Sequence, residues 1–182
     1  GKVVICDGRS PYAMTPPSPE WAETLAGFGW LRHLRAAESS LTRSLARTLV
    51  DDWISSQSRW TAQHWNPEAV SRRIISWLTH APFILSDADA RFYRRFIRSL
   101  GRQVRYLRWA LRRTADGVPR LQVAIALTDA ALCMADQARL MRFANRRLVD
   151  ELQRQILPDG GHISRNPGVL IELLLDLLPL RQ

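Results

Sequence analysis

The chain contains few of the residues that mark several common classes of protein. Of its 182 residues, two are cysteines and one is a lysine. Two cysteines, Cys6 and Cys133, are too few to indicate a disulfide-stabilised protein of an oxidising compartment, and no Cys/His spacing resembles a zinc site. We therefore expect two unpaired thiols, no metal and no other cofactor.

Long apolar segments are also missing. No run of about 18 apolar residues occurs, so the sequence predicts no membrane-spanning helix. The apolar start Gly1–Cys6 is too short for the core of a signal peptide. With 46% hydrophobic and 24% charged residues, the composition is that of an ordinary globular protein. We expect a soluble bacterial protein of the periplasm or the cytoplasm.

Positive charge is abundant and is carried almost entirely by arginine. The formal net charge is +9, and Lys2 is the only lysine. Arginine offers two parallel donors to a carboxylate, sulfate or phosphate, which favours a polyanionic partner. A GC-rich genome, which favours arginine codons, would give the same composition. The composition alone leaves both explanations open.

Strand-type alternation is absent after residue 20, and the pattern is helical almost throughout. Val3–Ile5 could form a short strand, but prolines interrupt the rest of residues 1–19, which we interpret as an extended arm or linker. Residues 20–182 are predicted to form an all-α domain of antiparallel helices. The seven predicted helices span about 19–37, 39–57, 67–80, 87–113, 119–134, 136–156 and from 166 onward.

The helix predicted over 87–113 has one strongly basic face. Its arginines recur every three or four residues, opposite an apolar face. The basic face could bind a polyanion or could be an ordinary solvated outer face. No helix-turn-helix, zinc-finger or RNA-binding motif accompanies it, so we predict no specific nucleic-acid partner. The arginines on this face are Arg91, Arg94, Arg95, Arg98, Arg102, Arg105, Arg108 and Arg112.

The segment 155–167 is the richest in turn formers and polar groups. It holds Pro158, Asp159, Gly160 and Gly161, followed by His162, Ser164, Arg165 and Asn166. A simple connection between helices needs only a few residues, and polar loops on rigid helices often carry function. Alternatively, His162 only satisfies backbone groups and Asp159–Gly160 only turns the chain.

Five segments in order resemble the helical domain of the heparinase II/III family of polysaccharide lyases. The resemblance covers about residues 25–180, and its most recognisable part is the Asp–Gly loop. The segments are Trp30–Ala37, Leu49–Ile54, Arg73–Trp77, Gln103–Leu107 and Gln155–His162. The resemblance implies an incomplete α/α toroid, followed in that family by a C-terminal β-sandwich domain that this chain lacks, so we expect a domain fragment.

The family's activity is β-elimination on acidic, uronate-containing polysaccharides, which would be the partner. Carried over to the matching positions, the resemblance implies His33 and His162 as catalytic residues. It implies Arg32, Arg73, Trp77, Arg165 and Asn166 as residues that bind the substrate.

The chain departs from the family at two places. Where an Asn–His pair is expected the sequence reads Val118–Leu121, and where a Tyr–His pair is expected it has Val169 and Leu170. A non-catalytic scaffold or a domain that binds glycans or polyanions is therefore the alternative.

The candidate residues also have structural alternatives. His33 could be hydrogen-bonded to a neighbour on its helix, and Arg73 could be a buried partner of Asp51 or Asp52. Tryptophans at 53, 60, 65 and 77 could be packing residues rather than platforms for a sugar ring.

Overall fold

The computed structural model describes residues 3–56, 64–135 and 138–181, and this part of the chain is all-helical, as predicted. Within these ranges the only pairing of β type is an isolated bridge between Ile156 and His162. The helices are α1 (Pro19–Gly27), α2 (Leu31–Ala36), α3 (Ser40–Ser56), α4 (Pro67–Thr79), α5 (Ala81–Leu85), α6 (Ala90–Ala110), α7 (Val118–Cys133), α8 (Ala138–Gln155) and α9 (Pro167–Leu177), with short 3₁₀ turns η1 (Pro11–Ala13), η2 (Leu111–Arg113) and η3 (Leu178–Arg181).

Three of the helices begin with a capping side chain followed by proline. Ser18 and Asn66 accept hydrogen bonds from the backbone N–H groups of Trp21 and Glu68, and Asn166 accepts one from Gly168. In each case a proline follows the capping residue, where its missing N–H costs no hydrogen bond.

Other predictions about secondary structure are wrong. The helix expected over about 19–37 is two helices, because Phe28 adopts a left-handed backbone with φ of 59° and ends α1. The short helix α5 begins directly after His80 and was not predicted. Val3–Ile5 forms no strand, and Val3 is 90% exposed.

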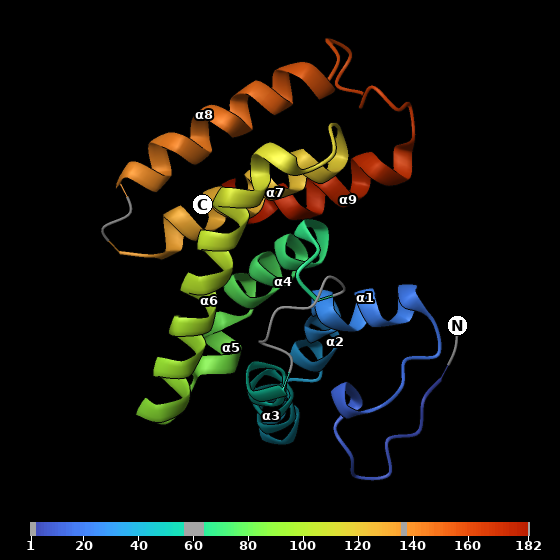
Figure 1. The fold of residues 1–182 in the computed structure, drawn as a ribbon, viewed down its shortest axis with the longest axis vertical. Coiled ribbons are helices and arrows are strands. Elements are labelled where there is room, and N and C mark those ends of the chain that lie inside the picture. The colour runs from blue at the N-terminus through green and yellow to red at the C-terminus, as the bar shows by residue number, and fades with distance from the viewer. Residues whose placement is uncertain (1–2, 57–63, 136–137, 182) are drawn as a thin grey trace.

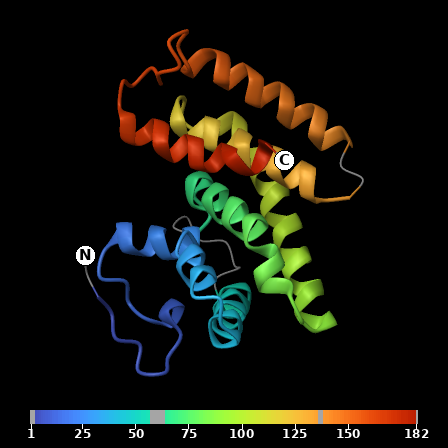
Figure 2. The ribbon, with the colours of Figure 1, turned by 180° about the vertical axis from the view of Figure 1, so that it is seen from behind.

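Helix α7 is the centre of the fold. It packs against α4 on one side and α8 on another, and α9 lies along it as well (Figure 1). Each residue from 121 to 131 is buried. Figure 2 shows the same arrangement from behind, with α1, α2 and α3 on the side of α4 away from α7, α8 and α9. No helix in the described ranges is long and apolar enough to cross a bilayer.

Aromatic side chains form the core between α1–α2, α3, α4 and α6. The rings of Trp53 and Trp77 meet edge to face with centroids 5.6 Å apart, and Trp77 stacks on Phe96 at 5.0 Å. Tyr12 lies 6.0 Å from Phe28, so η1 of the N-terminal arm is packed onto this core. The packing interpretation holds for Trp53, Trp65 and Trp77, which are all buried; Trp60 lies outside the described residues.

Candidate functional site

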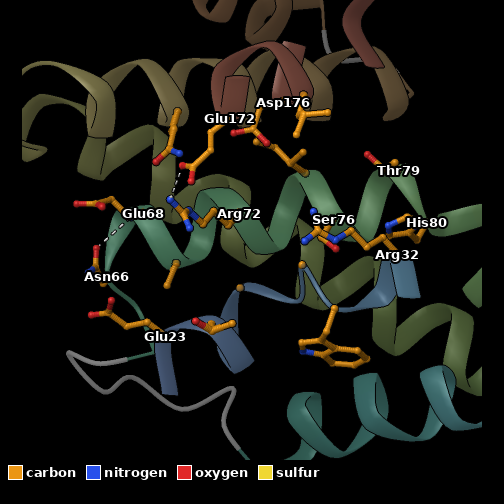
Figure 3. A pocket seen from close by; sticks show the side chains of 18 of the residues that line it. Glu23, Arg32, Asn66, Glu68, Arg72, Ser76, Thr79, His80, Glu172 and Asp176 are labelled. Carbon is orange, nitrogen blue, oxygen red and sulfur yellow. Dashed lines mark hydrogen bonds and ion pairs between the residues drawn. The ribbon is translucent and has the colours of Figure 1, made fainter. Parts of the chain in front are cut away.

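A groove of about 670 Å³ runs between α1, α2, α4 and α9. Figure 3 shows the side chains that line it. Helix α4 forms its floor with Arg72, Ser76 and Thr79, and α9 forms a wall with Glu172 and Asp176. Two of the predicted site residues, Arg32 and His33, line this groove.

The groove has ends of opposite charge. The carboxylates of Glu23 and Glu68 lie at one end, and the guanidinium of Arg32 lies at the other, next to His80 (Figure 3). Between them, Arg72 bridges α4 to α9 through an ion pair with Glu172 at 3.4 Å. Both partners of this pair are more than half exposed, so it contributes less than about 1 kcal/mol to stability.

Arg32 and His33 are the predicted site residues that do reach the groove. Both side chains are exposed at its rim on α2, and Arg32 Nε donates to His33 Nε2 at 3.3 Å. His33 is thus bonded to its helix neighbour, as the structural alternative expected.

Sequence reasoning missed His80, which also lines the groove. Its side chain is 8% exposed, and Nδ1 has no hydrogen-bond partner among the described residues. Burial, and then the nearby charge of Arg35, lower the pKa of His80 below its usual value. We therefore expect a neutral imidazole.

Two carboxyl groups lie between α7 and α9 with perturbed pKa values. Burial, and to a smaller extent the negative charge of Asp176, together raise the pKa of Asp129 to about 7. Burial also raises the pKa of Asp176 to about 6, against the opposing effect of Arg72. One oxygen of Asp129, Oδ2, is buried without a hydrogen-bond partner in the described part of the chain.

Arg73 points away from the groove into the core. Its guanidinium donates to Gln103 Oε1 at 2.7 Å and to the backbone carbonyls of Ala26 and His64 at 2.9 and 3.0 Å. It lies 4.0 Å from the ring of Trp53, and burial lowers its pKa to about 9. The predicted partner Asp51 instead pairs with Arg95 at 2.9 Å.

Trp77 is also on α4 and is fully buried in the aromatic core. Neither Arg73 nor Trp77 is therefore exposed to a ligand in the groove. Arg72, the neighbour that does face the groove, was not predicted. Helical periodicity could have found it, since Arg72 and Arg73 must point 100° apart.

The loop after α8 places His162 in a closed hydrogen-bond network. Its Nδ1 accepts from the Ser164 N–H at 3.1 Å, and its Nε2 lies 3.2 Å from Gln155 Oε1. The Gln155 amide nitrogen donates to Gly117 O and Glu151 Oε2, which fixes Oε1 toward the histidine. These partners favour the tautomer with its proton on Nε2.

Arg165 and Asn166 lie in the same loop, and their contacts stabilise its conformation. Arg165 pairs with Asp159, and both side chains are more than half exposed. Asn166 caps α9. None of the three predicted loop residues lines the groove with Arg32 and His33, so the structure gathers only part of the predicted site. The contacts described above show where the predicted site residues lie. The catalytic and binding roles predicted for them remain predictions.

A second surface is the outer face of α6. Its exposed arginines run along one side of the helix, and the sequence 90–113 contains no acidic residue. Of the arginines in α6, only Arg95 forms an ion pair within the described residues. The predicted basic face is therefore exposed and largely without carboxylate partners.

The described residues thus define an all-helical domain with one groove of mixed charge and one basic helix face. No family model matches the chain, and no solved structure matches it. It is similar to FtsZ-localized protein C from Caulobacter vibrioides, with 32% identity over 170 residues. The alignment covers 93% of this chain and 29% of that relative, so the chain spans less than a third of its length.

This comparison overturns the resemblance drawn from the sequence. The relative is named for its localisation with FtsZ, so the predictions of the heparinase II/III family, of a polysaccharide lyase and of glycan binding are wrong. The predicted partners, an acidic polysaccharide and the β-sandwich domain of that family, are withdrawn as well. Arg73, Trp77 and Gln103, which belong to the quoted motifs, are fully buried between packed helices, and Arg73 donates a hydrogen bond to Gln103.

Proposed function

We propose that this chain is a protein-binding domain of a bacterial protein that associates with FtsZ at the division site. The observation that carries this proposal is the alignment with FtsZ-localized protein C, which extends over 93% of the chain. Because it includes nearly the whole helical domain, the relative contains a corresponding domain rather than a short shared motif.

The surface of the domain supports a binding role. The groove has acidic and basic ends and the α6 face is basic, so the domain offers charged surfaces to a partner. His33 and His162, the two predicted catalytic residues, are engaged with Arg32 and with Gln155 and Ser164. A binding domain requires no reactive side chain.

We further propose that the helices form the antiparallel hairpins of an incomplete toroid. The packing of α7 against both α4 and α8 supports it. An experimental structure in which successive hairpins do not turn in one direction about a common axis would contradict it.

The test follows the chain and FtsZ in cells and in solution. The chain fused to a fluorescent protein is expected to gather where labelled FtsZ gathers and to disperse when FtsZ is depleted. Purified chain and FtsZ should bind each other in a surface-binding assay, with the fluorescent protein alone as the control. A uniform cellular distribution together with no binding in solution would contradict the proposal.

A further inference from the structure

Exposed arginines of α6 and of the following turn η2 form a stripe along one side of the helix. We define the arginine stripe as Arg91, Arg94, Arg98, Arg102, Arg105 and Arg112. Successive members lie three, four or seven residues apart, which keeps them on one side of a helix. All six side chains are exposed, and none forms an ion pair within the described residues. At a rise of 1.5 Å per residue, the stripe is roughly 30 Å long.

Aromatic rings contact one arginine of the stripe, Arg102, and one arginine beside it, Arg108. Arg102 lies 5.5 Å from the ring of Trp65, and Arg108 lies 5.7 Å from the ring of Phe143. Such contacts restrict the long side chain before any partner arrives. The entropy lost on binding an anion is therefore smaller than for a freely moving arginine.

The surface also includes apolar groups. Trp109, which shares the face of the stripe, is 55% exposed, and Ile97, at its edge, is 38% exposed. Trp109 has Arg113 over its ring at 4.3 Å and Tyr106 beside it. Its ring face is thus partly occupied, whereas nucleic-acid bases stack on free aromatic faces. Carboxylates with interspersed apolar side chains suit this mixed surface better than a chain of phosphates.

We propose that the arginine stripe binds an acidic segment of a partner protein in extended conformation. This inference rests on the proposed function in taking the partner to be a protein. An extended chain advances about 3.3 Å per residue, so roughly ten residues span the stripe. Alternate side chains then recur at about 6.6 Å, close to the rise of 4.5–6 Å between stripe arginines three or four residues apart. Each carboxylate can take two parallel donors from one guanidinium.

The test uses fluorescein-labelled deca-glutamate and fluorescence anisotropy at several salt concentrations. The stripe variant is Arg94→Glu with Arg98→Glu. The matched control is Arg142→Glu with Arg146→Glu on α8, also an exposed pair four residues apart. Each double variant lowers the formal net charge from +9 to +5, so general attraction changes equally.

We expect the stripe variant to bind deca-glutamate about tenfold more weakly and the control less than twofold more weakly. Circular dichroism should confirm that both remain helical, and Arg94→Ala with Arg98→Ala provides a milder second variant. Equal weakening in both double variants would overturn the inference, because charge alone would then explain binding. Tighter, stripe-dependent binding of a single-stranded DNA decamer would overturn it in favour of nucleic acid.

Measuring the binding of FtsZ to the wild-type chain and to the stripe variant distinguishes a failure of this inference from a failure of the proposed function. If wild-type chain and the stripe variant bind FtsZ equally, the stripe proposal fails and the proposed function stands. If the wild-type chain does not bind FtsZ, the proposed function fails, whatever the peptide result. Selective loss of FtsZ binding in the stripe variant supports both.

Discussion

Helices α7 and α9 are both rich in apolar residues and lie against each other, yet only α7 is buried. Every residue of α7 from 121 to 131 is buried, whereas Ile171, Leu174 and Leu175 of α9 are each more than half exposed. The difference is one of position, since α7 lies between α4 and α8 while α9 covers only one side of α7. Apolar composition therefore predicts a helix better than it predicts burial.

The largest expected effect is at the centre of α7. Ile125→Ala removes three carbon atoms from a side chain that is fully buried. We expect the free energy of unfolding to fall by about 3 kcal/mol, from lost burial and the cavity left behind. Urea unfolding followed by circular dichroism measures this value, and a loss below about 1 kcal/mol would contradict the central place given to α7.

A smaller effect, this time a gain in the free energy of unfolding, is expected from replacing Asp129 at the contact between α7 and α9. The pKa of Asp129 is raised from an ordinary 3.8 to about 7, so between about pH 4 and 7 the folded state binds more protons than the unfolded state. Stability must then fall as pH rises through that window. We expect Asp129→Asn to stabilise the protein by roughly 2 kcal/mol at pH 8.

The same variant should have almost no effect at pH 4, where the carboxyl group of Asp129 is already neutral in the folded state. Thermal unfolding of both proteins at pH 4 and pH 8 measures the difference. An equal effect at both pH values would show that the charge of Asp129 is not the cause.

The smallest effect is expected on the exposed side of α9. Leu174→Ala removes three carbon atoms, as many as Ile125→Ala, but Leu174 is already 53% exposed. We expect a change in the free energy of unfolding within about 0.5 kcal/mol. Unfolding in urea under the conditions used for Ile125→Ala gives the direct comparison, and equal losses would remove the distinction between the helices.

The helices were predictable because their signals are local. Periodicity placed most of them within a few residues, and Ser18, Asn66 and Asn166 act as caps as their sequences suggest. The break at Phe28 was not predictable, since its left-handed backbone depends on a ring buried among residues distant in sequence. No local propensity favours a phenylalanine in that conformation.

The candidate site was much less predictable than the helices. Arg72 and Glu172 meet across the groove although 100 residues separate them in sequence. Periodicity shows which face of a helix is apolar, but it does not show which helices become neighbours. The quoted motifs misled for a related reason: Arg73 and Gln103 look like functional polar residues in sequence, and they turn out to bond to each other inside the core.

The buried ring of Phe28 has a consequence for how this sequence can vary. Its left-handed backbone costs about 1–2 kcal/mol for any residue with a side chain, and glycine would remove that cost. Glycine would also leave a void where Phe28 now meets Trp30, Trp53 and Trp77, at a larger loss of about 3–5 kcal/mol. Natural selection is therefore expected to retain a large apolar side chain at position 28 in related chains, although the backbone there would suit glycine.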